Sequence, residues 1–113
     1  MQFSVDAAFI GCCGISPERG YTDHSFDGVE VHREMLSRAR RRVLVADSSK
    51  FGRDGSIVIG EAGCVDEIIT DSGVSQEHVR AFRDLGVTVT VVELPPESRQ
   101  ASGGEKDRRR DLT

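Results

Sequence analysis

The sequence predicts an α/β domain built around a largely parallel sheet with flanking helices. Strand-like and helix-like segments alternate along the 113 residues, a length that suits one domain. The run Val43–Ala46 is apolar at every position, which is typical of a strand buried on both faces of a parallel sheet. Polar segments follow three of the expected strands, at the sheet edge where ligands of such folds bind.

The first part of the chain predicts a strand, a loop and a helix. Val5–Gly11 reads as a short buried strand, and the glycines and proline after it predict a long loop over Gly11–Asp23. Asp27–Arg42 is the clearest helix, with Asp27 as its N-cap. The stripe expected to face the core consists of Val31, Met35, Leu36 and Ala39.

The end of this helix, Arg38–Arg42, is rich in arginine. Cations suit the negative C-terminal pole of a helix, and we prefer that interpretation to a nucleic-acid patch. The net charge of −4 also argues against this chain wrapping nucleic acid by itself, because such binding relies on a basic face that neutralises phosphates.

After Val43–Ala46 the chain predicts a polar loop over Asp47–Gly55 and two short strands. The strands are Ser56–Gly60, placed at an edge, and Asp66–Asp71, which again ends in polar residues.

The last part predicts a second helix, a strand and a tail. Ser75 should cap a helix over Gln76–Leu85 that ends at Gly86. Its inward side chains are expected to be Val79, Phe82 and Leu85. Val87–Leu94 reads as the last strand, and residues 95–113 have the mixed charge and missing apolar periodicity of a disordered tail.

The composition and the cysteine spacing also indicate where the protein is located in the cell and whether it binds a metal or cofactor. No apolar run approaches the ~18–20 residues that span a bilayer, and the first residues do not resemble a secretory signal, so we expect a cytoplasmic protein without a membrane partner. The three cysteines, Cys12, Cys13 and Cys64, have neither disulfide-framework nor zinc spacing. We interpret them as small, half-buried side chains and predict no metal or cofactor.

Lys50 is the strongest candidate for a binding residue. It follows Asp47 and Ser49 at an expected strand end, near the polar loop Thr70–Gly73. A lysine there supplies a point charge for phosphate or carboxylate, while Ser49 adds a hydroxyl and Asp47 orients Lys50 or accepts from a sugar hydroxyl. The same residues also fit an Asx-type turn with a solvated lysine, so the pattern leaves both interpretations open.

Two glycines and two helix residues are weaker candidates. Gly11 and Gly14 either let backbone amides approach an anion or form a tight turn. Glu30 and His32 lie near the start of the first helix and fit either a pocket or a solvated helix face. His24 and His78 are expected at the surface. No Ser/His/Asp or Cys/His set has the spacing of nucleophilic catalysis.

Three segments together resemble the C-terminal sensor domain of DeoR-family transcriptional repressors. They are "DAAFIGCCGISPERGYTD", "VEVHREMLSRARRRVLVADSSKFGR" and "VDEIITDSGV", and the similarity covers about Val5 to Val92. The motifs that carry it are Asp6, Gly14-Ile15, Gly20, Thr22, Glu30, Met35, Asp47-Ser48-Ser49-Lys50-Phe51-Gly52 and Ile69-Thr70-Asp71.

This resemblance implies a three-layer fold similar to ribose-5-phosphate isomerase and CoA-transferases. Such a domain binds a phosphorylated sugar or related metabolite, which relieves the binding of operator DNA by an N-terminal helix-turn-helix and induces genes of carbohydrate metabolism. By this resemblance Asp47 and Lys50 belong to the effector pocket, with Gly11 to Ile15 and Glu30 beside them. His32 stands where the family usually has a lysine, which implies a weaker or pH-dependent contact.

The resemblance also implies that residues 1–94 are the C-terminal part of a sensor domain. We expect the helix-turn-helix and the Gly-rich first half of the sensor to be absent from this chain, so that operator DNA is a partner only through a segment outside it. An apolar sheet edge or face left open would then be covered by self-association, which predicts a homo-oligomer.

Two alternative functions stay open at this point. One is a phosphosugar isomerase with Asp47 or Glu30 as the base and Lys50 as its electrostatic partner. The other is an oligomerisation module whose pocket no longer works. We prefer the regulatory, non-enzymatic reading because fold similarity does not carry an activity with it.

Overall fold

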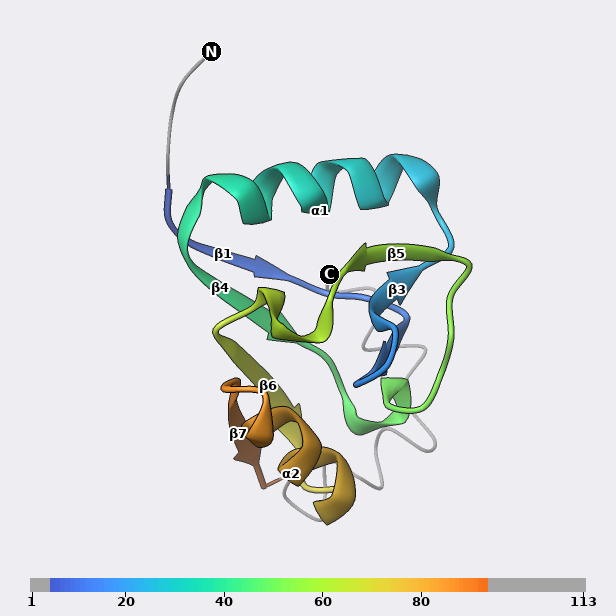
Figure 1. The fold of residues 1–113 in the computed structure, drawn as a ribbon, viewed down its shortest axis with the longest axis vertical. Helices are drawn as coiled ribbons and strands as arrows, with labels where there is room; N and C mark the ends of the chain where they lie inside the picture. The colour runs from blue at the N-terminus through green and yellow to red at the C-terminus, as the bar shows by residue number, and fades with distance from the viewer. Residues whose placement is uncertain (1–4, 94–113) are drawn as a thin grey trace, which may run out of the picture.

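The computed structural model describes residues 5–93 (Figure 1). Its strands and α-helices are, in chain order, β1 (Val5–Ile10), β2 (Gly14–Ser16), β3 (Gly20–Asp23), α1 (Phe26–Arg38), β4 (Ala39–Val45), β5 (Ile57–Gly60), β6 (Glu67–Asp71), α2 (Gln76–Asp84) and β7 (Thr88–Val92). Two short 3-10 helices are η1 (Ser48–Lys50) and η2 (Ala62–Cys64). The predicted tail and Leu94 lie outside the described residues.

A parallel four-stranded sheet organises the molecule, as the sequence predicts. Its strand order is β1-β4-β6-β7, so each connection moves the same way across the sheet. Because crossovers between parallel strands are right-handed, connections that all move in one direction fall on one face. Figure 1 shows α1 at the top of the view above β1, and α2 at the bottom beside β6 and β7.

One row of side chains crosses the sheet and forms the base of the core. Ile10, Leu44, Ile68 and Val89 are in register and buried. They belong to one apolar cluster with side chains from both helices and from the strands between them. Phe82 of α2 is its largest contributor of helical origin, and its ring lies 6.1 Å from Tyr21 and 6.0 Å from Phe51, measured between centroids.

The opposite face of the parallel sheet carries exposed apolar side chains. Phe9, Val45 and Val92 alternate with the buried row and are exposed. The helices and the smaller sheet contribute their buried side chains to the other face. Within residues 5–93, helices therefore cover one face of the parallel sheet. The second helical layer of the resembled three-layer fold, on the other face, is not among these residues.

A second, antiparallel sheet replaces most of the predicted loop over Gly11–Asp23. Strands β2 and β3 form a hairpin, and β5 pairs with β3 at the edge of this three-stranded sheet, whose order is β2-β3-β5. The prediction of a loop over the whole segment was wrong. Its glycines indicated a loop, but Gly14–Ser16 and Gly20–Asp23 form two short strands. Tyr21 is fully buried there and donates its hydroxyl hydrogen to the Ala62 carbonyl at 2.7 Å.

Helix α1 is shorter at its C-terminal end than predicted. Ser25 is the N-cap and accepts from the Gly28 N–H at 3.2 Å, in place of the predicted Asp27. Strand β4 begins at Ala39 because the following residues pair with β1, Val5 with Ala39 and Ala7 with Arg41. Of the arginines only Arg38 lies in the last helical turn. Tertiary pairing here overrides the helical pattern.

The buried face of α1 is also different from the predicted one. Val29 and Leu36 face the core, together with Ala39 just after the helix. Val31 and Met35 were expected inside but are 57% and 36% exposed. The predicted stripe was therefore rotated, which leaves apolar side chains on the outer surface of the helix.

Helix α2 confirms most of its prediction. Ser75 accepts from the His78 N–H at 3.1 Å as N-cap, and Gly86 follows the helix with φ of +87°. Val79 and Phe82 are buried, but Leu85 is 51% exposed as the C-cap, so its predicted inward position was wrong. Among the described residues no helix has the length and apolar character needed to cross a bilayer.

Replacing Phe82 should destabilise the fold strongly. Phe82→Ala removes a fully buried ring that two other rings contact, so we expect a loss of about 3–5 kcal/mol in the free energy of unfolding. Phe26→Ala is the matched control, since Phe26 is 61% exposed and should cost little. Urea unfolding followed by circular dichroism measures both, and equal losses in the two variants would contradict the assigned core.

Candidate functional site

The three polar loops predicted at strand ends come together in the structure. The Gly52 N–H donates to the Ile15 carbonyl at 2.8 Å, which joins the loop after β4 to the β2–β3 hairpin. The Ser48 N–H donates to the Asp71 carboxylate at 2.8 Å, which joins the same loop to the end of β6. The carboxyl edge of the parallel sheet therefore gathers the loops that follow β1, β4 and β6.

Lys50 stands at the end of η1 and is half-buried. Asp47 is the N-cap of this short helix: its carboxylate accepts from the Ser49 N–H at 2.9 Å and from the Ser49 hydroxyl. The Asx-type turn considered from the sequence is therefore present. The Asp47 carboxylate is bonded within this turn, and the turn fixes the backbone from which the Lys50 side chain extends.

A cavity of about 370 Å³ opens beside Lys50. It is lined by Cys13, His24, Lys50, Arg53 and Asp54. The Asp54 carboxylate already pairs with the Arg19 guanidinium at 2.8 Å. The wall thus offers the charges of Lys50 and Arg53, and this arrangement suits an anionic ligand.

Asp23 holds two of the residues that line this cavity, Cys13 and His24, by hydrogen bonds. Its carboxylate accepts from the Cys13 thiol at 3.0 Å and from the His24 N–H at 2.7 Å. Burial alone raises the pKa of Asp23, but these two bonds and the nearby His32 and His24 charges outweigh it and hold that pKa below its usual value. The bond to Asp23, followed by burial, raises the pKa of Cys13, so this thiol keeps its proton.

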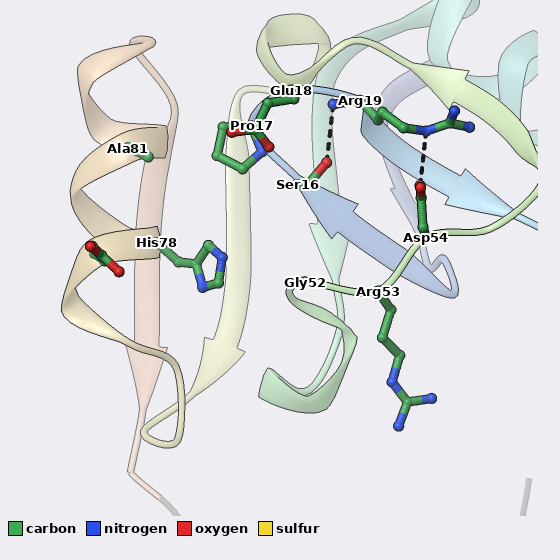
Figure 2. A pocket seen from close by; sticks show the side chains of 10 residues that line it. Ser16, Pro17, Glu18, Arg19, Gly52, Arg53, Asp54, His78 and Ala81 are labelled. Carbon is green, nitrogen blue, oxygen red and sulfur yellow. Dashed lines mark hydrogen bonds and ion pairs between the residues drawn. The ribbon is translucent and has the colours of Figure 1, made fainter.

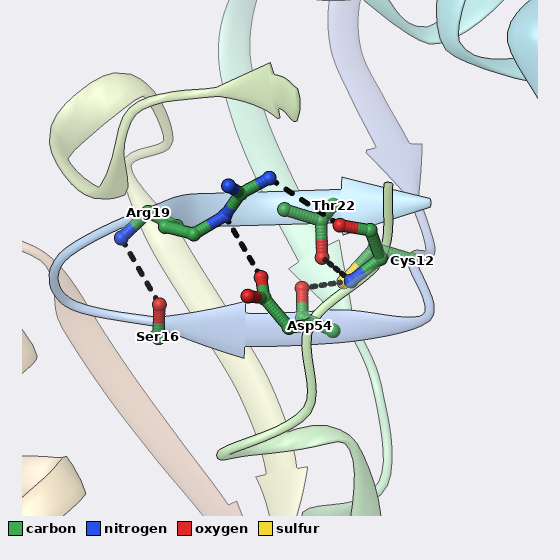
Figure 3. A network of polar contacts seen from close by, with 7 residues as sticks. Cys12, Ser16, Arg19, Thr22 and Asp54 are labelled. Atoms are coloured by element: carbon green, nitrogen blue, oxygen red, sulfur yellow. Dashed lines mark hydrogen bonds and ion pairs between the residues drawn. The ribbon is translucent and has the colours of Figure 1, made fainter. Parts of the chain in front are cut away.

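The segment that carries Arg53 is held against the hairpin by a polar network (Figure 3). Besides its ion pair with Asp54, Arg19 donates to the Gly55 carbonyl at 3.3 Å. The Gly55 N–H donates to the Thr22 hydroxyl at 2.7 Å. These contacts restrain the backbone on one side of Arg53, as the bond from Gly52 to Ile15 does on the other.

Gly14 is required by this close approach. A Cβ built on Gly14 would lie 2.5 Å from the Arg53 carbonyl oxygen and 2.6 Å from the Thr22 hydroxyl oxygen. Gly11 is less constrained, because a Cβ there meets only the Val45 carbonyl oxygen, at 3.5 Å. Ile15 is fully buried, so its side chain serves the core and cannot contact a ligand in the cavity.

The two helix candidates are separated by the structure. His32 is half-buried and is not among the residues that line the Lys50 cavity. Its Nδ1 is buried without a hydrogen-bond partner among the described residues. Glu30 is exposed on α1 and lines a different groove, between that helix and β1. Glu30 is therefore not brought to Lys50.

A second cavity, of about 490 Å³, lies between the hairpin turn and α2 (Figure 2). It shares Arg53 and Asp54 with the first cavity, and Arg19 and His78 line it from opposite sides. The His78 ring packs on Phe51, with 5.3 Å between centroids. The two cavities thus flank the segment that carries Arg53.

The cysteines provide no reactive thiolate. Burial raises the pKa of Cys12 to about 12, and burial also raises that of Cys64. Cys12 is buried and the other two are half-buried, which confirms the interpretation of small side chains at these positions. Within residues 5–93, no group of three or more His, Cys, Asp and Glu side chains is placed to hold a metal ion.

Sequence reasoning missed three residues of the Lys50 cavity: Cys13, His24 and Arg53. Arg53 belongs to the predicted polar loop, and its place after the Lys50 turn was the available signal. His24 and Cys13 gave none, because only the pairing of β2 with β3 brings both ends of the hairpin to one place.

Comparison with known proteins gives one consistent result. The family model of the DeoR C-terminal sensor domain matches residues 1–72. The chain is 38% identical over 93 residues to the HTH-type transcriptional repressor GlcR of Bacillus subtilis (strain 168), covering 81% of this chain and 35% of that protein. An uncharacterized HTH-type transcriptional regulator of the same organism, YulB, is 33% identical over 92 residues, covering 81% and 36%.

A third relative is the glycerol-3-phosphate regulon repressor of Escherichia coli (strain K12). It is 31% identical over 71 residues, which cover 63% of this chain and 28% of that protein. The chain spans about a third of the length of the curated relatives it matches. These relatives are named repressors and regulators, not enzymes.

Substituting Gly14 should disturb the loop of Arg53. Gly14→Ala places a methyl group against the Arg53 carbonyl and the Thr22 hydroxyl, so we expect a loss of about 1–3 kcal/mol in stability. Gly63→Ala is the matched control because nothing lies within 4 Å of a Cβ there. Urea unfolding measures both, and an unchanged midpoint for Gly14→Ala would contradict the close packing of this loop.

The Asp23 carboxylate should add an acid-dependent term to stability. Since its folded pKa is lowered, its contribution is present above the unfolded value of about 3.9 and is lost as the pH falls through the lower folded value. Asp23→Asn should therefore flatten the fall of stability on the acid side, measured by urea unfolding at stepped pH. Asp84→Asn, on the exposed end of α2, is the control. Parallel acid profiles for wild type and Asp23→Asn would argue against this assignment.

Proposed function

The chain belongs to the family of DeoR C-terminal sensor domains, and on that premise we propose that it senses a phosphorylated sugar or a related phosphorylated metabolite. The domain is regulatory: the relatives it matches are transcriptional repressors and regulators. None of these names supports the alternative of a phosphosugar isomerase. The proposal places the chain in a cytoplasmic repressor of carbohydrate metabolism.

The observation that carries this proposal is the cationic cavity at the carboxyl edge of the sheet. Lys50 and Arg53 face it from one loop, and His24 lines it from the end of β3. Because Asp54 is paired with Arg19, its charge opposes these cations less than an unpaired carboxylate would. A phosphate dianion there would receive charge-assisted hydrogen bonds, the strongest kind available to a protein.

The ligand size also fits a small phosphorylated metabolite. The Lys50 cavity has a volume of about 370 Å³, at the lower end of the range for small-molecule sites. The Ser49 hydroxyl and the Asp47 carboxylate bond to each other on the turn that carries Lys50, and neither is among the residues that line this cavity.

Regulation would work through linkage. A ligand that prefers one arrangement of the whole repressor shifts it away from the DNA-binding arrangement, typically with a coupling of ~1–3 kcal/mol. The DNA-binding part would be a helix-turn-helix in a longer protein, which is the type of regulator that the names of two relatives state for those proteins. This chain would supply the sensing step only.

Removing the Lys50 charge should weaken ligand binding. Isothermal titration of the 113-residue chain with glycerol 3-phosphate and a panel of pentose and hexose phosphates should identify at least one ligand. Lys50→Ala should then lose about 1.5–3 kcal/mol of binding free energy, roughly ten- to hundredfold in affinity, because a charge-assisted bond is removed. Arg53→Ala should show a loss of the same order.

Two controls sharpen this test. Arg80→Ala removes an exposed cation from α2 and should leave the affinity unchanged. Unphosphorylated sugars should bind measurably more weakly than their phosphates. The absence of binding by every phosphate, or equal binding by wild type and Lys50→Ala, would refute the proposal for this cavity.

A further inference from the structure

A further cavity lies under helix α1, away from the Lys50 site. It encloses about 220 Å³ and shares no lining residue with the two cavities beside Arg53. In Figure 1, β5 lies below α1, and these two elements form part of the cavity wall together with residues of β4 and η2. The charged residues that line it are Arg33 of α1 and Arg42 of β4, and no carboxylate among residues 5–93 does so. The cavity is therefore cationic.

The sheet register places this cavity away from the carboxyl edge. Val43 pairs with Glu67, the first residue of β6, so Arg42 is level with the start of that strand. Because Arg42 precedes Leu44 of the buried core row by two residues, it stands on the same face of the sheet, which α1 covers. Lys50 follows the other end of β4. The cavity and the Lys50 site are thus separated along the direction of the strands.

Both guanidinium groups are positioned by neutral backbone carbonyls. Arg33 donates from Nε to the Ile59 carbonyl at 3.4 Å and from Nη2 to the Val58 carbonyl. Arg42 donates from Nη1 to the Cys64 carbonyl at 3.2 Å. In the described part of the chain, neither guanidinium forms an ion pair. Three other arginines do pair with carboxylates: Arg19, Arg38 and Arg41. The two charges at this cavity are therefore fixed in place without an opposite charge.

These bonds leave hydrogen-bond donors on both arginines. A guanidinium carries five N–H groups, and the Nε–Nη2 edge can hold two oxygens of one anion in parallel. In Arg42 only Nη1 has a partner, and Nε is buried without one among residues 5–93. In Arg33 the carbonyls occupy Nε and Nη2, so Nη1 keeps its two N–H groups. A buried donor without a partner costs free energy that an acceptor would recover.

We propose that this cavity binds one tetrahedral oxyanion, inorganic phosphate or sulfate, between Arg33 and Arg42. Its volume of about 220 Å³ lies below the ~300–1,000 Å³ that is usual for small-molecule sites, so it suits a single oxyanion better than a whole sugar phosphate. Donors that approach from a helix and from a strand match the several oxygens of a tetrahedral anion. The site is separate from the Lys50 cavity and does not rest on the sugar-phosphate function proposed above.

Two carboxylates near the cavity bear on its charge. Asp66 accepts from the Arg42 backbone N–H at 2.8 Å and forms no ion pair with the Arg42 guanidinium. Glu61 is exposed and does not line the cavity, but its charge reaches Cys64, which does. Burial raises the pKa of Cys64, the Arg42 charge opposes that rise, and the Glu61 charge adds to it. Glu61 is therefore the group that should weaken anion binding here.

Nuclear magnetic resonance of the ¹⁵N-labelled 113-residue chain tests the proposal. Inorganic phosphate, added at constant ionic strength through the millimolar range, should saturably shift the backbone amides of three lining residues: Ser37, Gly60 and Cys64. Sulfate should shift the same amides. The shifts should persist in Lys50→Ala, so this result stands apart from the test of the sugar-phosphate site.

Three variants identify the groups that bind the anion. Arg33→Gln removes one charge and should weaken phosphate about tenfold, and Arg42→Lys should do the same because it keeps the charge but loses the Nε–Nη2 edge. Glu61→Gln should strengthen binding, by about two- to fivefold. Arg40→Gln is the matched control, since Arg40 is exposed on β4 and does not line the cavity. Circular dichroism checks that each variant is folded.

Three results would overturn the proposal. One is the absence of saturable shifts at the three lining amides with inorganic phosphate. Another is equal phosphate affinity in Arg33→Gln and Arg40→Gln. The third is a shift of these amides by glycerol 3-phosphate but not by inorganic phosphate, because the site would then recognise an organic phosphate and not the free anion.

Discussion

The direction in which the chain crosses its sheet is the constraint on which the other features depend. Because every connection from β1 to β7 moves the same way, the covering elements gather on one face. They share one core on the row Ile10, Leu44, Ile68 and Val89. The same order aligns the carboxyl ends of β1, β4 and β6, and the far face of the sheet carries exposed apolar side chains.

The candidate site follows from how tightly its loops are attached to that core. Phe51 is packed against Phe82, so the residues on either side of it, Lys50 and Gly52, project from an anchored point. The hairpin supplies the second anchor, through the network of Arg19 and the close approach at Gly14. A binding loop held on a rigid scaffold positions its charges without ordering them at the moment of binding, which favours affinity.

The sequence was sufficient for features set by local or repetitive patterns. The parallel sheet and the cap of α2 followed from an apolar run and from Ser75 and Gly86 at the two ends of a helical pattern. The meeting of the Lys50 loop with the loops after β1 and β6 followed from the polar residues at three strand ends. It failed where contacts distant in sequence decide. Pairing with β1 ends α1 at Arg38, and β3 pairs on its other side with β5, more than thirty residues away. For the same reason the sequence could not show that Glu30 lines the groove between α1 and β1 and not the cavity at Lys50.

The overall and local charges have different consequences. The chain carries a net charge of −4, which disfavours contact with a long polyanion such as DNA. Screening limits a charge to about 8–10 Å at physiological ionic strength, so a small ligand responds only to its immediate surroundings. Around the cavity these are Lys50 and Arg53, with Asp54 neutralised by Arg19. On the proposed function, an acidic domain would hold one phosphate group at this cavity, and operator DNA would contact another part of the repressor.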